Sequence, residues 1–172
     1  MESEKKPMKK EKKLIAEFYE LKIEQLMDKK VWDIPIVDKE TPILNILSIL
    51  DGKSHVWIVN EKEDKELIGV ITRQDVLEIL APPRTSYRMF SVPSYKSRDT
   101  DAIAEDVMNR DPITAKCEEK IVDVLQKMIK HRIRRLPVVD QNNKIIGEIT
   151  LQHLIHKFYL ASQYHSIIDE EK

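Results

Sequence analysis

The sequence LIGVIT at residues 67–72 returns as IIGEIT at residues 145–150, so the chain contains an internal repeat. A short run rich in valine and isoleucine precedes each copy, at residues 56–59 and 136–139, and a polar turn joins each run to its copy. Short β-branched runs are typical of buried strands, and turns rich in Asp and Asn favour hairpins. The pattern therefore predicts one two-stranded hairpin in each repeat.

An amphipathic helix is predicted upstream of each hairpin, because the apolar residues there fall on one helical face. A short extended stretch precedes each of these helices, at residues 35–37 and 112–114, and a second helix follows each hairpin, at residues 74–80 and 152–160. The predicted fold class is therefore α/β (α+β), with two β-α-β-β-α repeats. One such unit buries too little apolar surface alone, so the two copies are expected to pack on each other. The apolar helix residues are Ile43, Leu44, Ile46, Leu47 and Leu50 in the first repeat, and Ile121, Val124, Leu125, Met128 and Ile129 in the second.

The composition excludes several classes of function. The 29 Lys and Arg residues nearly balance the 30 Asp and Glu residues, which argues against a dedicated nucleic-acid binder. Only three of the 172 residues are glycine, and neither G-x-G-x-x-G nor the P-loop pattern occurs, so a glycine-rich phosphate loop is excluded. No apolar run approaches the roughly 18 residues that cross a bilayer, and no apolar signal core follows the Lys-rich start. A cytoplasmic chain is expected.

The remaining segments are expected to flank or connect the repeats. Residues 1–13 hold six lysines and three glutamates, and we expect them to be disordered, whereas helical spacing begins at Leu14. The sequence IEQLM at residues 23–27 parallels AEDVM at residues 104–108, ahead of the second repeat. The predicted parts are a Lys-rich tail and helix at 1–22, the first repeat at 23–81, a proline-containing linker at 82–103, the second repeat at 104–160, and a C-terminal tail at 161–172.

The sequences DPIT at residues 111–114, RRLPVVD at 134–140 and IIGEIT at 145–150 together resemble a CBS (cystathionine beta-synthase) domain. The tandem resembles a Bateman module over residues 23–158. This resemblance implies two repeats packed with pseudo-twofold symmetry, an N-terminal helix packed beside them, and a homodimer. It also implies that clefts between the repeats bind an adenosine compound such as AMP, ADP, ATP or S-adenosylmethionine.

The ribose motif of the family is Gly-x-x-Thr/Ser-x-x-Asp, and GVITRQD at residues 69–75 matches it in full. The resemblance implies that the Asp75 carboxylate accepts ribose hydroxyls and that the Thr72 hydroxyl reaches ribose or phosphate. Spacing alone favours a capping box, with Thr72 as the N-cap and Asp75 three residues on. The two roles are compatible, because a carboxylate at an exposed helix start has a second oxygen available.

The second copy departs from this motif. GEITLQH at residues 147–153 keeps Thr150 but places His153 where the motif has an acid. Neutral imidazole offers one acceptor and one donor, so it cannot accept both hydroxyls of a diol. The second ribose site is therefore expected to be empty or to hold a ligand in another pose, with one dominant site around Thr72 and Asp75.

Phosphate and adenine contacts are implied by position in the family. Arg134 and Arg135 stand where related modules carry phosphate-contacting His or Arg, and His55 takes the corresponding position in the first repeat. As bare sequence, the two arginines are equally well a solvated surface pair. Adenine contacts through backbone groups and apolar side chains are implied for Ile36, Val37, Ile113 and Thr114, which are otherwise ordinary strand residues.

No catalytic residues and no metal site are expected. His153 and His156 lie one turn apart on a predicted helix, but no third ligand is suggested nearby, and Cys117 has no evident base beside it. The Lys-rich start is interpreted as a solvated tail, because it contains glutamates and lacks aromatic residues. We expect no enzyme, no catalytic cofactor, and neither a membrane nor a nucleic-acid partner.

The leading hypothesis is a regulatory module with a role such as energy sensing. An adenosine nucleotide binds to it, and the module regulates an unidentified partner protein in trans, because the two repeats use nearly all of the chain. The alternative is a structural or dimerisation adaptor whose nucleotide sites are degenerate. His153 supports the alternative, and the intact pair of Thr72 and Asp75 opposes it.

Overall fold

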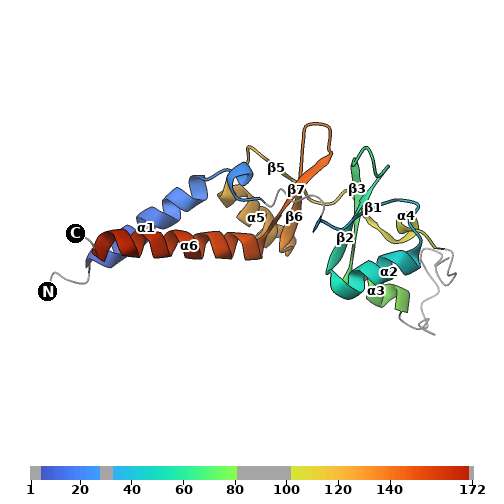
Figure 1. Ribbon diagram of the computed structural model, residues 1–172, viewed down its shortest axis with the longest axis horizontal. Helices are drawn as coiled ribbons and strands as arrows, with labels where there is room; N and C mark the ends of the chain where they lie inside the picture. Colours follow the sequence, from blue (N-terminus) through green and yellow to red (C-terminus); the bar gives the residue numbers. More distant parts are fainter. Residues whose placement is uncertain (1–4, 28–32, 81–101, 171–172) are drawn as a thin grey trace. The chain divides into compact units, whose positions relative to one another are not determined.

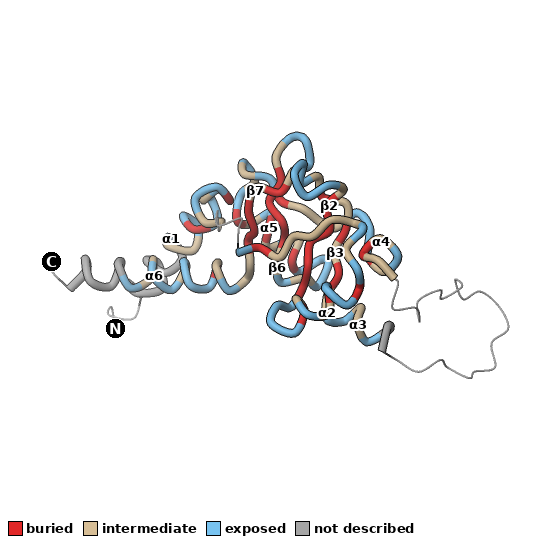
Figure 2. Tube along the Cα trace, turned by 45° about the vertical axis from the view of Figure 1, so that its right-hand side comes forward, coloured by how far each residue is buried: buried red, intermediate tan, exposed pale blue. Residues whose placement is uncertain are grey.

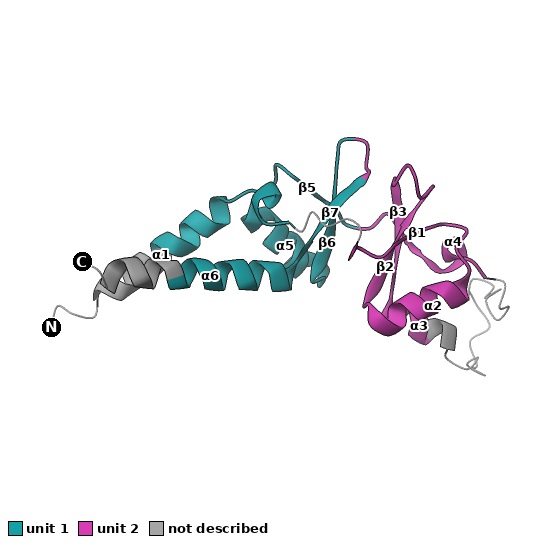
Figure 3. Ribbon diagram, in the orientation of Figure 1, with its two compact units in different colours: residues 1–31, 113–141, 145–172 teal, residues 32–112, 142–144 magenta. Residues whose placement is uncertain are grey.

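The computed structural model describes residues 5–27, 33–80 and 102–170, with side chains described at 13–27, 33–77 and 102–163. The chain divides into two compact units (Figure 3). Unit 1 consists of residues 1–31, 113–141 and 145–172, and unit 2 consists of residues 32–112 and 142–144. Each unit has its own sheet and its own hydrophobic core.

Unit 2 contains the β-α-β-β-α elements of the first repeat and a four-stranded sheet in the order β1-β2-β3-β4 (Figure 1). Strand β1 is parallel to β2, and β3 is antiparallel to both of its neighbours, β2 and β4. The elements are β1 (Ile36–Asp38), α2 (Ile43–Gly52), β2 (His55–Val59), β3 (Leu67–Thr72), α3 (Arg73–Leu80), α4 (Ala104–Val107) and β4 (Asn109–Arg110).

Unit 1 contains the β-α-β-β-α elements of the second repeat and a three-stranded sheet in the order β5-β6-β7. Helices α1 and α6 lie side by side in it, and the rings of Phe18 and Phe158 meet edge to face with 5.2 Å between their centroids (Figure 1). The elements are α1 (Lys5–Glu20), the 3-10 helix η1 (Ile23–Gln25), β5 (Ala115–Lys116), α5 (Ile121–His131), β6 (Arg135–Val139), β7 (Ile145–Thr150) and α6 (Leu151–Glu170).

In each core, the apolar face of a helix packs against the apolar face of the hairpin. Helix α2 buries Ile43, Ile46 and Leu50, which are three and four residues apart and therefore share one face. Alternate residues of the hairpin, Val56 and Ile58, pack in the same cluster. Helix α5 buries its own residues at the same spacing, and Figure 2 shows buried positions on the strands of both units.

The segment that precedes β1 packs in unit 1, and the segment that precedes β5 packs in unit 2. In unit 1, the backbone N–H of Ile23 donates to the carbonyl of Glu119 at 3.0 Å. In unit 2, the N–H of Ile43 donates to the carbonyl of Ala102 at 2.8 Å. Ile23 and Ala104 are fully buried, so the parallel sequences IEQLM and AEDVM occupy equivalent positions in opposite repeats.

Within unit 1, a hydrogen bond from the Lys120 amine to the Glu20 carboxylate joins α1 to the start of α5, and it raises the pKa of the Lys120 amine.

The predicted fold class is confirmed, since both repeats show the order β-α-β-β-α. Four details differ from the expectations. Strand β5 lies at Ala115–Lys116 instead of residues 112–114, and β4 was not expected. The expected disorder at residues 1–13 is wrong from Lys5 onward, because Lys and Glu are good helix formers and α1 begins there. The segment expected as a C-terminal tail is helical as far as Glu170, and the expected linker lies outside the described residues except at 102–103.

The close packing of Met108 on strand β3 yields a stability prediction. A Cβ at Gly69 would lie 2.4 Å from the sulfur of Met108 and 3.1 Å from its Cβ, whereas a Cβ at Gly52 has no atom within 4 Å. We expect Gly69→Ala to lower the free energy of unfolding by about 1 to 3 kcal/mol, because overpacking forces neighbours to shift. Gly52→Ala should cause no loss. Denaturant unfolding of both variants checks this, and equal stabilities would contradict the packing argument.

Candidate functional site

Thr72 and Asp75 form a hydrogen-bonded pair at the junction between β3 and α3. Thr72 is the last residue of β3, and α3 begins at Arg73. The backbone N–H and the hydroxyl of Thr72 both donate to Oδ2 of Asp75, each at 2.7 Å. Asp75 therefore accepts the N–H of Thr72, which is one half of the predicted capping box, whereas the Thr72 hydroxyl donates to the carboxylate.

A third donor reaches the same carboxylate from a distant segment. The side-chain Nδ2 of Asn109 donates to Oδ1 of Asp75 at 2.8 Å. Asn109 lies on β4, directly opposite Val70 of β3. No pattern in the sequence indicates this residue, because a two-residue strand shows no periodicity and Asn109 is 34 positions from Asp75.

His55 lies beside this pair on the sheet. It is the register partner of Thr72, and only 3% of its surface is exposed. Its ring meets the ring of Trp57 at an interplanar angle of 69°, with 4.9 Å between centroids. Alternate residues of a strand share a face, so His55, Trp57 and Thr72 lie on the face opposite the core of unit 2.

The two candidate residues of strand β1 face opposite sides of the sheet. Ile36 is the register partner of Trp57, and Val37 is the register partner of Ile58. Val37 packs against the core cluster that contains Ile58. Ile36 therefore shares the face of His55 and Thr72, and the side chain of Val37 does not.

The corresponding junction in the second repeat is capped in the reverse sense. The hydroxyl of Thr150 accepts the backbone N–H of His153 at 3.1 Å. In the first repeat the residue three positions on supplies a carboxylate as the acceptor, whereas here the threonine hydroxyl is the acceptor. The change from Asp to His therefore leaves the helix capped but removes the carboxylate that the ribose motif requires.

The two arginines of the second repeat have different surroundings. Arg135 is the register partner of Thr150, and its guanidinium lies 3.2 Å from the carboxylate of Glu148. The side chain of Glu148 is only 10% exposed, so this is a largely sheltered pair. Arg134 is exposed, and its carbonyl accepts the N–H of Leu151. Of the two arginines predicted to contact phosphate, Arg135 is thus paired with Glu148 and Arg134 lies exposed on the surface.

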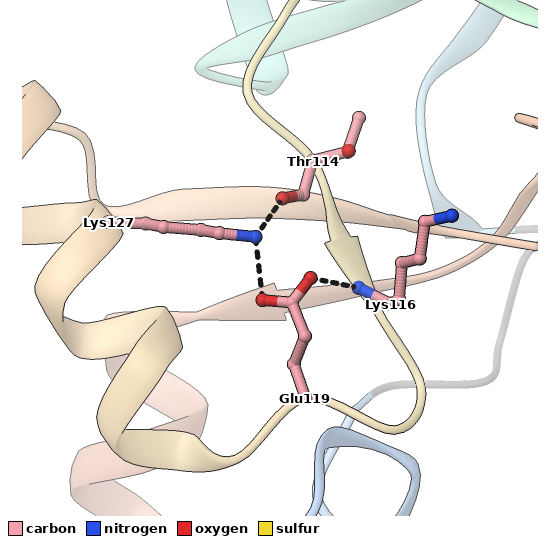
Figure 4. Close-up of polar contacts among 4 residues, drawn as sticks. All are labelled: Thr114, Lys116, Glu119 and Lys127. Atoms are coloured by element: carbon pink, nitrogen blue, oxygen red, sulfur yellow. Dashed lines mark hydrogen bonds and ion pairs between the residues drawn. The ribbon is translucent and has the colours of Figure 1, made fainter.

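A lysine from α5 holds the segment just ahead of β5, which contains the remaining candidates Ile113 and Thr114 (Figure 4). The Lys127 amine donates to the carbonyl of Thr114 at 2.9 Å and to Glu119 at 2.6 Å. The second oxygen of Glu119 accepts the N–H of Lys116 at 3.0 Å. Thr114 is thereby fixed by its backbone, while the side chain of Ile113 packs against the core of unit 1.

The ten predicted site residues thus fall into two groups of five, one in each unit. In unit 2, His55, Thr72 and Asp75 come together, with Ile36 on the same face. In unit 1, Arg135 and Thr150 are register partners, whereas the backbone of Thr114 is held by α5. Within the described parts of the chain, no three His, Cys, Asp or Glu residues are grouped to hold a metal ion. No helix of those parts has the length and apolar character of a membrane span.

The sequence of the chain matches the family model of the CBS domain at residues 23–82 and 104–159, which together are more than half of the chain. The chain belongs to the CBS domain family. The predicted resemblance to a CBS domain pair is thereby confirmed, and the two matched regions correspond to the two β-α-β-β-α repeats.

Curated relatives contain similar CBS regions. Uncharacterized protein MJ1426 of Methanocaldococcus jannaschii is 31% identical over 126 residues, which are 73% of this chain and 72% of that protein. Uncharacterized protein MK0525 of Methanopyrus kandleri is 34% identical, over 60% of this chain and 46% of its own length. The arabinose 5-phosphate isomerase KdsD of Francisella tularensis is also 34% identical, over 78% of this chain and 37% of the isomerase. The chain thus spans less than half the length of two of these relatives.

Solved CBS structures share the fold. The CBS domain pair of protein MJ0100, in complex with 5′-methylthioadenosine and S-adenosyl-L-methionine, has a TM-score of 0.59 and 24% identity, covering 80% of this chain and 95% of that chain. CBSX2 in complex with AMP has a TM-score of 0.67 and 18% identity, covering 82% of this chain and 98% of CBSX2. At these identities the likeness establishes the fold of the two CBS domains.

Proposed function

We propose that this CBS domain pair is a regulatory module that binds an adenosine nucleotide at Thr72 and Asp75 and regulates a partner protein in trans. The observation that carries the proposal is the Asp75 carboxylate. Two hydrogen bonds from Thr72 and one from Asn109 fix it at the end of β3, next to His55. A fixed carboxylate can accept ribose hydroxyls without first losing side-chain entropy.

The ligand class is supported by the related structures. CBS domain pairs of the same fold are found with AMP in one case, and with 5′-methylthioadenosine and S-adenosyl-L-methionine in another. All three ligands contain adenosine, so the shared chemistry is a purine nucleoside with a ribose. We propose AMP, ADP, ATP or S-adenosylmethionine as the regulatory ligand, and with an adenylate the module would serve energy sensing.

A non-catalytic role is part of this proposal. The CBS domain is a regulatory module, and relatives that carry enzyme names match this chain over a small part of their length. The match covers 17% of the homoserine O-acetyltransferase of Methanosphaera stadtmanae and 22% of the inosine-5′-monophosphate dehydrogenase of Methanocaldococcus jannaschii. We propose that this chain acts in the cytoplasm on a separate protein and has no reaction of its own.

A second candidate function is a structural or dimerisation adaptor with degenerate nucleotide sites. The second repeat favours it, because His153 replaces the motif carboxylate and Arg135 is already paired with Glu148. The first repeat opposes it, because its ribose motif is intact. The adaptor therefore becomes the better account only if no adenosine compound binds.

A homodimer is proposed for either function. Both repeats expose large apolar side chains on helices, and we propose that these helices contact a second copy of the chain. A second copy of the chain would cover these helices symmetrically. The residues are Leu44 on α2, Leu77 on α3, Ile129 on α5 and Ile155 on α6, with exposed fractions from 56% to 76%.

Calorimetric titration with AMP tests the proposed site. Asp75→Ala should weaken binding by at least about tenfold, because a hydrogen bond to a charged group contributes roughly 1.5 to 3 kcal/mol. His153→Ala should change little, whereas His153→Asp should add or tighten a second binding event. The unfolding free energy of Asp75→Ala is measured alongside, since loss of the cap alone costs about 1 kcal/mol. If Asp75→Ala binds AMP as the parent does while His153→Ala loses binding, the assignment of the site is reversed. If the parent binds neither AMP, ATP nor S-adenosylmethionine at millimolar concentration, the adaptor function is supported.

Changes at the arginines test the proposed phosphate contact. The double variant Arg134→Ala/Arg135→Ala should weaken AMP more than adenosine, because only AMP carries the phosphate. Arg135→Ala alone also removes the ion pair with the Glu148 carboxylate, so Arg135→Ala/Glu148→Gln serves as the matched control. Equal losses for AMP and adenosine in the double variant would contradict a phosphate contact.

Sedimentation velocity tests the proposed dimer. The parent should sediment as a dimer, and Leu44→Lys/Leu77→Lys or Ile129→Lys/Ile155→Lys should shift it toward the monomer, because each pair places charge on an apolar helix surface. These side chains are exposed, so the variants should keep the unfolding free energy of the parent. A parent that sediments as a monomer at all concentrations would contradict the dimer.

A further inference from the structure

The hydrogen bonds of Asp75 limit how it can hold a ribose. A carboxylate has about four acceptor positions, two on each oxygen. Oδ2 already accepts the N–H and the hydroxyl of Thr72, and Oδ1 accepts the amide of Asn109. One acceptor position on Oδ1 is left, whereas a ribose diol brings two O–H donors. A second acceptor must therefore come from another group.

Asn109 places that second acceptor next to the first. An ionised carboxylate accepts hydrogen bonds and donates none, so the amide must turn its NH2 group toward Asp75. Its carbonyl Oδ1 belongs to the same small planar group and is left to accept from a ligand. The backbone of β4 holds Asn109 in place, because Asn109 pairs with Val70 and Arg110 pairs with Gly69. The side chain is exposed, so a ligand can reach it.

We propose that Asp75 and Asn109 share the ribose diol, with one hydroxyl donating to Oδ1 of Asp75 and the other to Oδ1 of Asn109. This inference rests on the proposed function and makes Asn109 a specificity residue for ribose over deoxyribose. The chain segment ahead of β5 thus completes the site of the first repeat. The second repeat has no equivalent carboxylate at its junction, since Thr150 itself accepts the N–H of His153.

Titration with three nucleosides tests the sharing of the diol. The probes are adenosine, 2′-deoxyadenosine and 3′-deoxyadenosine, which carry no phosphate and differ by one hydroxyl. The parent should bind each deoxynucleoside more weakly than adenosine, by at least about tenfold where the bond to the charged Asp75 is lost and by about threefold to tenfold where the bond to the neutral Asn109 is lost. Asn109→Ala should bind adenosine more weakly by a similar factor. It should also bind one of the two deoxynucleosides as well as it binds adenosine, because the missing hydroxyl no longer has a partner.

Arg110→Ala is the matched control on the same strand. Arg110 is exposed and pairs with Glu105, so its removal leaves the Asp75 network intact and should preserve the affinities of the parent for all three nucleosides. Denaturant unfolding of each variant shows whether β4 remains folded.

Two results would overturn the inference alone. Asn109→Ala could bind adenosine as tightly as the parent does, or it could lose the same factor for all three nucleosides, which would mean that Asn109 only positions Asp75. A parent that binds none of the nucleosides and no nucleotide would overturn the proposed function, and the shared diol with it.

Discussion

Each small sheet must bury one face under a helix, and this requirement sets the direction of the candidate site residues on the strands. In unit 2, Val56, Ile58 and Ile71 face the core with helix α2. Strand alternation then places His55, Trp57 and Thr72 on the opposite face. Met108 covers Gly69 at a distance that leaves no room for a Cβ, so the same core also fixes β4 and the position of Asn109.

In the proposed function, one carboxylate of the first repeat serves both stability and recognition. Asp75 caps α3 through Thr72 and is anchored by Asn109, so its oxygens are fixed before any ligand arrives. In the second repeat the Thr150 hydroxyl caps the helix by accepting the backbone N–H of His153, so the cap does not use the His153 side chain. Two repeats with the same order of elements thus have different acceptor chemistry. This difference is the physical basis for proposing one nucleoside site in each chain.

The fold could be predicted from the sequence wherever a period was present. The hairpins followed from β-branched runs, and α2 and α5 followed from apolar residues three and four positions apart. Strand β4 and Asn109 could not be predicted, because two residues carry no period and their partner β3 is distant in the chain. The exchange of residues 21–27 and 102–108 between the repeats also left no local signal, although their similar sequences indicated equivalent positions.

Amide signals of the 15N-labelled chain during titration with AMP test the central claim most directly, which is that Asp75 is the centre of the ligand site. The backbone N–H of Thr72 and the side-chain NH2 of Asn109 both donate to Asp75. The account predicts that these two signals shift most and saturate at the same AMP concentration. The account would be contradicted if both signals stayed fixed while those of Thr150 and His153 moved, or if no signal responded to AMP.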